Sequence, residues 1–393
     1  MKSVITIALL LMTVSAVAQE SATGQPAAYK TAVKVLGKTV LAEAEKALRE
    51  PPVTVTASHC LRSAGGRHDF YSEGDYWWPN PVSVDSPYIQ KDGMSNPDNF
   101  VAHRQAMIRF SRIVGTLAAA WRITKKEIYV KKAMEHACAW FVDTATLMHP
   151  NLLYAQAIKG RATGRGIGII DAIQLMEVAQ GLYIMQSAPA MDQQALQQIK
   201  NWFAQYLQWV TTHQYGKDEM NAANNHGTCW AMQVACFAKF TGNQKLMDFC
   251  SNRYKTVLLP AQMAADGGFP KELARTKPYG YSLFNLDAMA TLCQILSTKE
   301  EDLWEYQTPD GRSVKKGIAY MYPYIRDKSK WPFRKDVMYW EEWPVAQPSL
   351  IFGAAAYKNR QWLNTWVKLK HFPDVEEVIR NLPVRNPLIW MEE

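Results

Sequence analysis

The stretch AHRQAMIRFSRIVGTLAAAW, residues 102–121, decides the fold of this chain. Its large apolar side chains recur every three or four residues, at Met107, Phe110, Val114 and Leu117. This spacing places them along one face of an α-helix, because the helix completes a turn in about 3.6 residues. The stretch therefore predicts a long amphipathic helix with one buried face.

The same periodicity continues through most of the chain. Leu196, Ile199, Phe203 and Val210 form the next clear stripe. A period of two, which is typical of strands, is found only in residues 52–57. The sequence therefore predicts an all-α protein. Further helices are expected at residues 28–48, 125–146, 171–186, 228–240, 244–258, 282–296, 317–324 and 349–358.

The arrangement of these helices predicts a ring. Helices of similar length joined by short loops indicate stacked antiparallel hairpins, and no heptad pattern is long enough for a coiled coil. We expect an (α/α) toroid of about six to seven helix pairs, with inner helices and loops that line a cleft. The chain is 48% hydrophobic and has fourteen tryptophans, enough for one large core. A single toroid domain over residues 19–393 is therefore expected.

The first residues have the pattern of an export signal. Met1 and Lys2 give a positive start, residues 4–17 are apolar, and Ala16 and Ala18 fit the small-residue rule for cleavage. We expect residues 1–18 to be a cleaved signal peptide and the mature protein to be periplasmic or secreted. No later segment has the roughly twenty consecutive apolar residues of a membrane helix, so no membrane association is expected after cleavage.

Cysteine and histidine usage predicts neither a disulfide framework nor a metal site. Six cysteines are few for a chain of 393 residues, and Cys229 and Cys236 lie in apolar helical sequence. Buried free thiols are therefore favoured. No cysteine pair has zinc-finger spacing, and the eight histidines are scattered. We expect no metal and no other cofactor.

The charge balance indicates an acidic partner. The formal net charge is +8. Nucleic acid is not expected, because the chain has no RNP, helix-turn-helix or zinc signature. Abundant aromatic and basic residues suit an anionic polysaccharide, whose sugar faces stack on rings and whose carboxylates need cations. A generic basic surface is the alternative, and the sequence leaves the oligomeric state open.

Three loop regions are rich in glycine together with basic or aromatic residues, at 63–99, 160–168 and 264–281. Long loops of this kind inside a compact domain are usually functional. The run Asn224-Asn225-His226 precedes the helix expected from residue 228, and one asparagine could cap that helix. A cap does not account for the second asparagine and the histidine, so we interpret Asn225 and His226 as functional.

Part of the third loop carries further candidates. Lys271, Arg275, Tyr279 and Tyr281 lie on a basic strip that leads into the helix expected near residue 282. Taken alone, the two tyrosines would be interpreted as packing residues and Arg275 as a surface residue. Their order after the asparagine-histidine run changes that interpretation.

Three strips together resemble the alginate lyase superfamily of polysaccharide lyases. They are GDYWWPNP at residues 74–81, Asn-Asn-His at 224–226, and Arg275 followed by Tyr281-Ser-x-Phe-Asn-Leu. The likeness spans residues 75–289, and the ordered combination is more specific than any one strip. The resemblance implies a helical toroid that cleaves uronic-acid polymers by β-elimination. Better-known members have their arginine and tyrosine one residue further apart, which keeps Tyr279 as an alternative to Tyr281.

The resemblance also implies roles for individual residues. β-Elimination needs groups that neutralise the uronate carboxylate, a base that removes the C5 proton and an acid that protonates O4. Asn225, helped by Arg275 or His226, would neutralise the carboxylate. Tyr281 would be the acid, and also the base for a syn substrate such as mannuronate, whereas His226 would be the base for an anti substrate. Arg275 would help the phenol to ionise, since the ordinary pKa of tyrosine is about 10.

Substrate binding is expected from the aromatic and basic loops. Tyr76, Trp77 and Trp78 would form a sugar-stacking wall, and Arg161 and Arg165 would hold further carboxylates. The other residues expected to bind substrate are Asn224, Lys271 and Tyr279.

A glycoside hydrolase that acts on an anionic polysaccharide is the main alternative. Helical toroids also host such enzymes, which need two carboxylic acids flanking the scissile bond. A glucuronan-specific lyase and a non-catalytic glycan-binding protein are further alternatives. The carboxylates available to a hydrolase, none of which forms an evident pair, are Asp75, Asp171, Glu272, Glu341 and Glu342.

Overall fold

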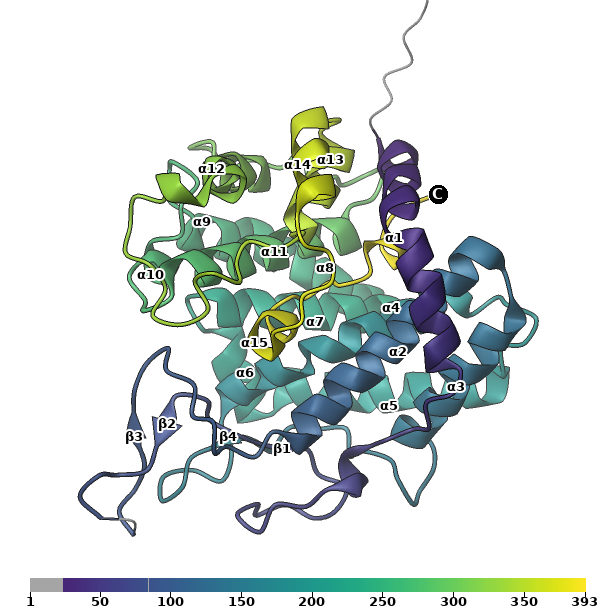
Figure 1. Ribbon diagram of the computed structural model, residues 1–393, viewed down its shortest axis with the longest axis vertical. Coiled ribbons are helices and arrows are strands. Elements are labelled where there is room, and N and C mark those ends of the chain that lie inside the picture. Colours follow the sequence, from purple (N-terminus) through teal and green to yellow (C-terminus); the bar gives the residue numbers. More distant parts are fainter. Residues whose placement is uncertain (1–23, 84) are drawn as a thin grey trace, which may run out of the picture.

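The computed structural model describes residues 24–83 and 85–393, so the expected signal peptide at residues 1–18 lies outside the described residues. Helices dominate the molecule (Figure 1), which confirms the all-α prediction. The helices of nine or more residues are α1 (Gln25–Ala47), α2 (Ala102–Thr124), α3 (Glu127–Phe141), α4 (Leu175–Met185), α5 (Gln193–Thr212), α7 (Asn225–Thr241), α8 (Gln244–Arg253), α11 (Pro278–Leu296), α12 (Val314–Arg326), α13 (Pro348–Ala356) and α14 (Arg360–Lys368), together with the 3₁₀ segment η2 (Gly166–Gln174).

Shorter elements connect these helices. The short helical segments are η1 (Val55–Ala57), α6 (Gln214–Met220), the π-helical turn η3 (Tyr254–Leu258), α9 (Leu259–Gln262), α10 (Pro270–Leu273), η4 (Lys328–Lys330), α15 (Glu376–Arg380) and η5 (Pro387–Ile389). The strands are β1 (Tyr71–Glu73), β2 (Trp77–Trp78), β3 (Ile89–Gln90) and β4 (Tyr154–Ala157).

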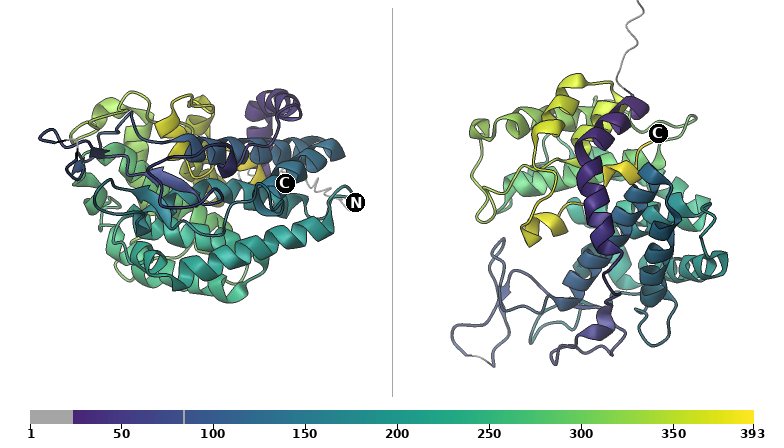
Figure 2. Two further views of the ribbon diagram at one scale, coloured as in Figure 1. Left: turned by 90° about the horizontal axis from the view of Figure 1, so that it is seen from below. Right: turned by 45° about the vertical axis from the view of Figure 1, so that its right-hand side comes forward.

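The helices form two layers that close on themselves. Helices α4, α7, α11 and α13 are buried on nearly all sides, whereas α5, α12 and α14 bury one face. Along the chain, α2 packs against α3 and α4, α4 against α7, α7 against α11, and α11 against α13. Helix α1 then packs against α13 and α14, so the two ends of the helical region meet (Figures 1 and 2). This closed order is the toroid that the sequence predicts.

Two small sheets lie at one end of the molecule, at the lower left of Figure 1. Strands β1 and β4 are parallel, with Tyr71 opposite Tyr154, and β2 and β3 are antiparallel, with Trp77 opposite Gln90. The sequence did not predict these strands. The prediction of a strand at residues 52–57 is wrong, because this stretch contains the 3₁₀ segment η1. The Thr54 hydroxyl there accepts a hydrogen bond from the Thr56 amide at 3.3 Å.

Two functional helices begin earlier than their apolar pattern predicts. Helix α7 begins at Asn225 and not at residue 228, because polar residues occupy its first turn. Helix α11 begins at Pro278 and not near residue 282, since proline is well tolerated in the first turn of a helix. His226 and Tyr281 are therefore both helical residues.

The buried interior accounts for two further features. All six cysteines are free and five of them are buried, as interpreted for Cys229 and Cys236. Within the described part of the chain, the helical stretch Gly166–Met185 is long and apolar enough to cross a membrane. Of its apolar window, 78% is buried inside the protein, as in the core helix of a toroid.

Candidate active site

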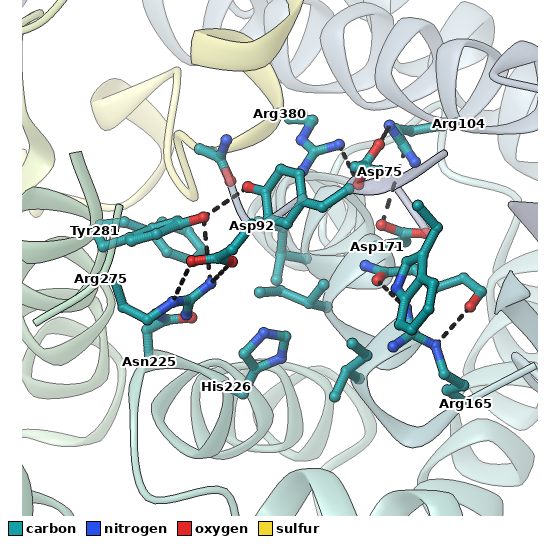
Figure 3. Close-up of a pocket in the computed structure, with 18 of the residues that line it drawn as sticks. Asp75, Asp92, Arg104, Arg165, Asp171, Asn225, His226, Arg275, Tyr281 and Arg380 are labelled. Carbon is teal, nitrogen blue, oxygen red and sulfur yellow. Dashed lines mark hydrogen bonds and ion pairs between the residues drawn. The ribbon is translucent and has the colours of Figure 1, made fainter. Parts of the chain in front are cut away.

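A pocket opens where the inner helices meet the loop that carries β2 and β3 (Figure 3). Segments from the whole chain line it, from Asp75 near the N-terminus to Arg380 on α15. The four residues expected to be catalytic all line the pocket, together with three of those expected to bind substrate. These seven residues are Tyr76, Trp77, Arg165, Asn225, His226, Arg275 and Tyr281.

The asparagine-histidine run forms the first turn of α7. Asn224 occupies the N-cap position, but its side chain makes no capping hydrogen bond to a described residue, so helix capping does not account for it. Buried Glu272 accepts hydrogen bonds from the backbone amide of Asn225 at 2.7 Å and from its Nδ2 at 2.8 Å. Glu272 therefore fixes the orientation of the Asn225 amide at the pocket wall.

A buried carboxylate orients the imidazole. Nδ1 of His226 lies 2.7 Å from Oε1 of Glu219, which has no exposed surface. Burial alone lowers the pKa of His226, but the charge and hydrogen bond of Glu219 outweigh it, so the pKa is raised above its ordinary value. With Nδ1–H donated to Glu219, Nε2 is left for the pocket, and Figure 3 shows the ring projecting into it.

The phenol of Tyr281 lies among hydroxyl and cationic groups. Its oxygen is 2.7 Å from the Tyr76 hydroxyl and 3.5 Å from Nη2 of Arg275. The Arg275 guanidinium lies 4.6 Å and Lys277 Nζ 5.4 Å from the centre of the ring. Burial and Tyr76 raise the pKa of Tyr281 well above its ordinary value, against the opposing effect of Lys277 and Arg275. At neutral pH the phenol therefore carries its proton, as a general acid must.

Arg275 is held by a carboxylate from a distant segment of the chain. Its Nη2 lies 2.8 Å from Oδ1 of Asp92 and its Nε 3.2 Å from Oδ2, and the Thr276 hydroxyl donates to Oδ2 at 2.9 Å. Burial raises the pKa of Asp92, but the hydrogen bond and the charge of Arg275 together lower it by more than burial raises it. The net shift of the pKa is therefore downward. The pair ties the segment after β3 to the segment before α11.

A charged cluster forms another wall. Asp75 bridges Nη1 of Arg104 at 2.8 Å and Nη1 of Arg380 at 2.7 Å, and Asp171 lies 3.9 Å from Nε of Arg104. Burial would raise the pKa of Asp75, but the two guanidiniums hold it well below the ordinary range. Asp75 is thus ionised and fully engaged, so it cannot donate a proton.

The other carboxylates considered for hydrolysis are no better placed. Glu272 is hydrogen-bonded to Asn225, and Glu341 and Glu342 are exposed and do not line the pocket. Among the described residues, the pocket therefore holds no evident pair of a protonated and an ionised carboxyl group suited to glycoside hydrolysis.

The aromatic wall differs from its prediction in part. Trp77 lines the pocket, with the guanidiniums of Arg161 and Arg165 lying 5.2 and 5.8 Å from its ring centre. Arg165 also lines the pocket, and burial lowers its pKa to about 10. Tyr76 presents its hydroxyl to Tyr281, whereas Trp78 lies outside the lining and donates from Nε1 to the carbonyl of Met94 at 2.9 Å.

Three other proposed residues lie away from the pocket lining. Tyr279 is fully buried, packs against Trp331 and donates to the carbonyl of Tyr324 at 3.1 Å. Lys271 is exposed on α10. Asn224 does not line the pocket, and its backbone carbonyl accepts a hydrogen bond from Nε2 of Gln262 at 2.9 Å.

Sequence reasoning missed several charged residues that orient the site. Glu219 lies seven positions before His226, and this acid beside the polar run was the one local signal. Asp92 lies in the loop at residues 63–99 that was expected to be functional, but nothing singled it out within that loop. Arg380 carried no signal, because it reaches the pocket from a segment far away in the sequence.

Known proteins resemble this chain both in sequence and in fold. Residues 54–331 match the family model described as alginate lyase. An alginate lyase from Bacteroides ovatus is 31% identical, with a TM-score of 0.79 over 93% of this chain and 98% of that one. Alginate lyase A1-III from Sphingomonas species A1 shares the fold at 15% identity, with a TM-score of 0.54 over 92% and 96%. A variant of A1-III complexed with a tetrasaccharide gives 15% and 0.58 over the same shares. No curated protein sequence matches.

Proposed function

The chain belongs to the alginate lyase family, and we propose that its pocket cleaves alginate by β-elimination with Asn225, His226, Arg275 and Tyr281 as the reacting set. The protein is a polysaccharide lyase that acts on alginate, and the roles of individual residues are our proposal. The observation that carries it is the convergence of these four side chains on one pocket, from segments about fifty residues apart.

Residues of α7 on the pocket wall neutralise the carboxylate of the substrate. Removing the proton on C5 sends charge into the neighbouring carboxylate, so donors must stabilise that charge. Asn225 stands beside His226 on the pocket wall, and Glu272 holds its amide in place. Arg275 adds positive charge close by, although Asp92 already occupies two of its nitrogens.

Proton transfer is shared between Tyr281 and His226. Tyr281 donates its proton to O4 as the C4–O4 bond breaks, and its raised pKa keeps that proton available. In an anti substrate such as guluronate, neutral His226 accepts the C5 proton at Nε2. For a syn substrate such as mannuronate, Tyr281 must first release its proton to solvent, then accept the C5 proton and pass it to O4. Burial and Tyr76 oppose that release, whereas Lys277 and Arg275 favour it.

The product distinguishes this function from the alternatives. A lyase creates a 4,5-unsaturated uronate that absorbs ultraviolet light, while a hydrolase produces reducing ends without that absorbance. Incubation with mannuronate-rich, guluronate-rich and glucuronan polymers should give ultraviolet absorbance with at least one of them. Reducing ends without absorbance would indicate a hydrolase, and an unchanged polymer viscosity would indicate binding alone.

The role of His226 has its own test. If the imidazole is the base for the anti substrate, His226→Ala should lower turnover of guluronate-rich polymer more than that of mannuronate-rich polymer, by about 10²-fold or more. Equal losses on both polymers would assign His226 to neutralisation or orientation instead.

Export is also part of the proposal. A cleaved signal peptide at residues 1–18 would deliver the enzyme to the periplasm or the exterior, where it can meet a polymer too large to enter a cell. Mass spectrometry of the protein expressed in a Gram-negative host should find the mature chain beginning near Gln19. An uncleaved cytoplasmic protein would contradict this.

A further inference from the structure

A second groove adjoins the catalytic pocket at Trp77. The groove lies along β1 and β4 and the loop at residues 158–164. Arg161 lines the groove and Arg165 lines the pocket, and both guanidiniums lie over the same Trp77 ring. Figure 3 shows Arg165 and Tyr281 on opposite sides of the pocket. The two linings share no residue, so Arg161, which lines the groove and lies over Trp77, is the link between the groove and the pocket wall away from Tyr281.

The groove carries an excess of positive charge. Its charged residues are three cations, Arg62, Lys159 and Arg161, and one carboxylate, Glu73, which leaves a net charge of +2. Both oxygens of Glu73 are bonded to Arg62, at 2.6 and 2.7 Å. Arg62 is therefore the partner of the one acid of the lining, and the two other cations, Lys159 and Arg161, lie on the loop at residues 158–164.

The cationic rim is held in a defined shape. Arg161 donates from Nε to the carbonyl of Tyr88 at 2.8 Å, and the Tyr88 amide donates to the carbonyl of Lys159 at 3.2 Å. Gly160 has φ of +74°, and a Cβ there would meet Pro87 at 3.0 Å, so glycine permits this close approach. The loop is thus fixed against the segment that also carries Trp77.

We propose that this groove is a distal subsite that binds the carboxylate of a further uronate in the polymer, beyond the sugars held at Tyr281. The inference rests on the proposed function. A chain that passes Trp77 from the pocket enters a hollow whose rim has two exposed cations, Lys159 and Arg161. The repeated carboxylates of a uronan match such a row of charges.

The distal subsite predicts a dependence on chain length. A short oligomer that fills the pocket gains little from the groove, whereas a long polymer gains the additional ion pairs. Reversal of one charge on the rim replaces attraction of the polymer by repulsion. Lys159→Glu should therefore raise the ratio of polymer KM to trisaccharide KM about fivefold.

The test compares matched variants on two probes, sodium polymannuronate and its purified trisaccharide. Double-bond formation is measured for wild type, Lys159→Glu, Arg161→Gln and Lys131→Glu. Lys131 is exposed on α3, so Lys131→Glu makes the same change of charge away from the groove. The two groove variants should raise the KM ratio, and the control should leave it unchanged.

An unchanged ratio in Lys159→Glu, or equal increases for polymer and trisaccharide, would overturn the distal subsite. If wild type turned over neither probe, the comparison moves to polyguluronate and glucuronan with their trisaccharides, and failure on these as well would be a failure of the proposed function itself. Calorimetric binding of the polymer would then decide the groove: weaker binding by Lys159→Glu than by Lys131→Glu supports it, and equal binding overturns it.

Discussion

His226 Nδ1 and Glu219 Oε1 lie 2.7 Å apart, with the carboxylate completely buried. The contact fixes the ring and directs Nε2 toward the pocket. It also raises the pKa of His226 against the opposing effect of burial. The site therefore depends on a residue that does not itself line the pocket.

Glu219→Gln should move the acidic limb of the pH profile on guluronate-rich polymer to lower pH. The amide carries no charge, so it no longer raises the pKa of His226, and the neutral base persists into more acidic solution. The limb is measured from kcat/KM against pH, which reports ionisations of the free enzyme. Glu135→Gln, at an exposed position on α3, is the control. A limb that stays in place would remove His226 as the titrating base.

Gln262→Met should lower kcat by about tenfold to a hundredfold with little change in KM. The buried amide of Gln262 donates to the Asn224 carbonyl and accepts from Thr228 Oγ1 at 2.8 Å and Asn285 Nδ2 at 2.9 Å. It thus joins the first turn of α7 to α11, which carries Tyr281. Methionine keeps the length of the side chain but makes none of these bonds.

The control for this change is Gln197→Met on the exposed face of α5. Steady-state kinetics and the melting temperature are measured for both variants. If Gln262→Met kept wild-type kcat while folded, the proposed positioning of the two helices would be wrong.

Wild type should lose stability as the pH rises from about 4 to about 7, and Asp287→Asn should not show this loss. Asp287 is buried in α11, its Oδ1 accepts from the Ser349 amide at 3.1 Å, and its Oδ2 has no hydrogen-bond partner among the described residues. Burial raises its pKa from 3.8 to about 7. Because the folded-state pKa is raised, the contribution of Asp287 to the free energy of unfolding is fully present below the unfolded pKa. It is lost as pH rises through the folded pKa.

The stability lost by wild type over this range is about 4 kcal/mol, because a tenfold change in the acid dissociation constant corresponds to about 1.36 kcal/mol. Urea unfolding of wild type and Asp287→Asn at about pH 4, 6 and 8 gives the difference in unfolding free energy directly. The advantage of the variant should grow with pH. A difference that is constant across this range would mean that Asp287 does not titrate as proposed.

The helical fold was predictable because helices such as α2 and α5 carry a periodic apolar stripe, as at Met107 and Phe110 in α2. The small strands were not, since β2 and β3 have two residues each and depend on the loop between them. The choice between Tyr279 and Tyr281 depended on where α11 begins. Two positions along a helix differ by about 200°, so one tyrosine faces the core and the other the pocket.

The site was predictable only where its residues are close in sequence. Asn225 and His226 form one polar run, and Arg275 and Tyr281 another. The pairs that orient them include Asp92 with Arg275, which are 183 positions apart. Such contacts arise from closure of the toroid and leave no local pattern.

The most direct test of the account is the rate of double-bond formation by Tyr281→Phe, with Tyr279→Phe as the control. Loss of one hydroxyl at Tyr281 should lower the rate by about 10²–10⁴-fold or more while polymer binding is kept. Tyr279→Phe loses only its bond to the Tyr324 carbonyl and should keep most of the activity. Near-normal turnover by Tyr281→Phe would contradict the proposed β-elimination mechanism.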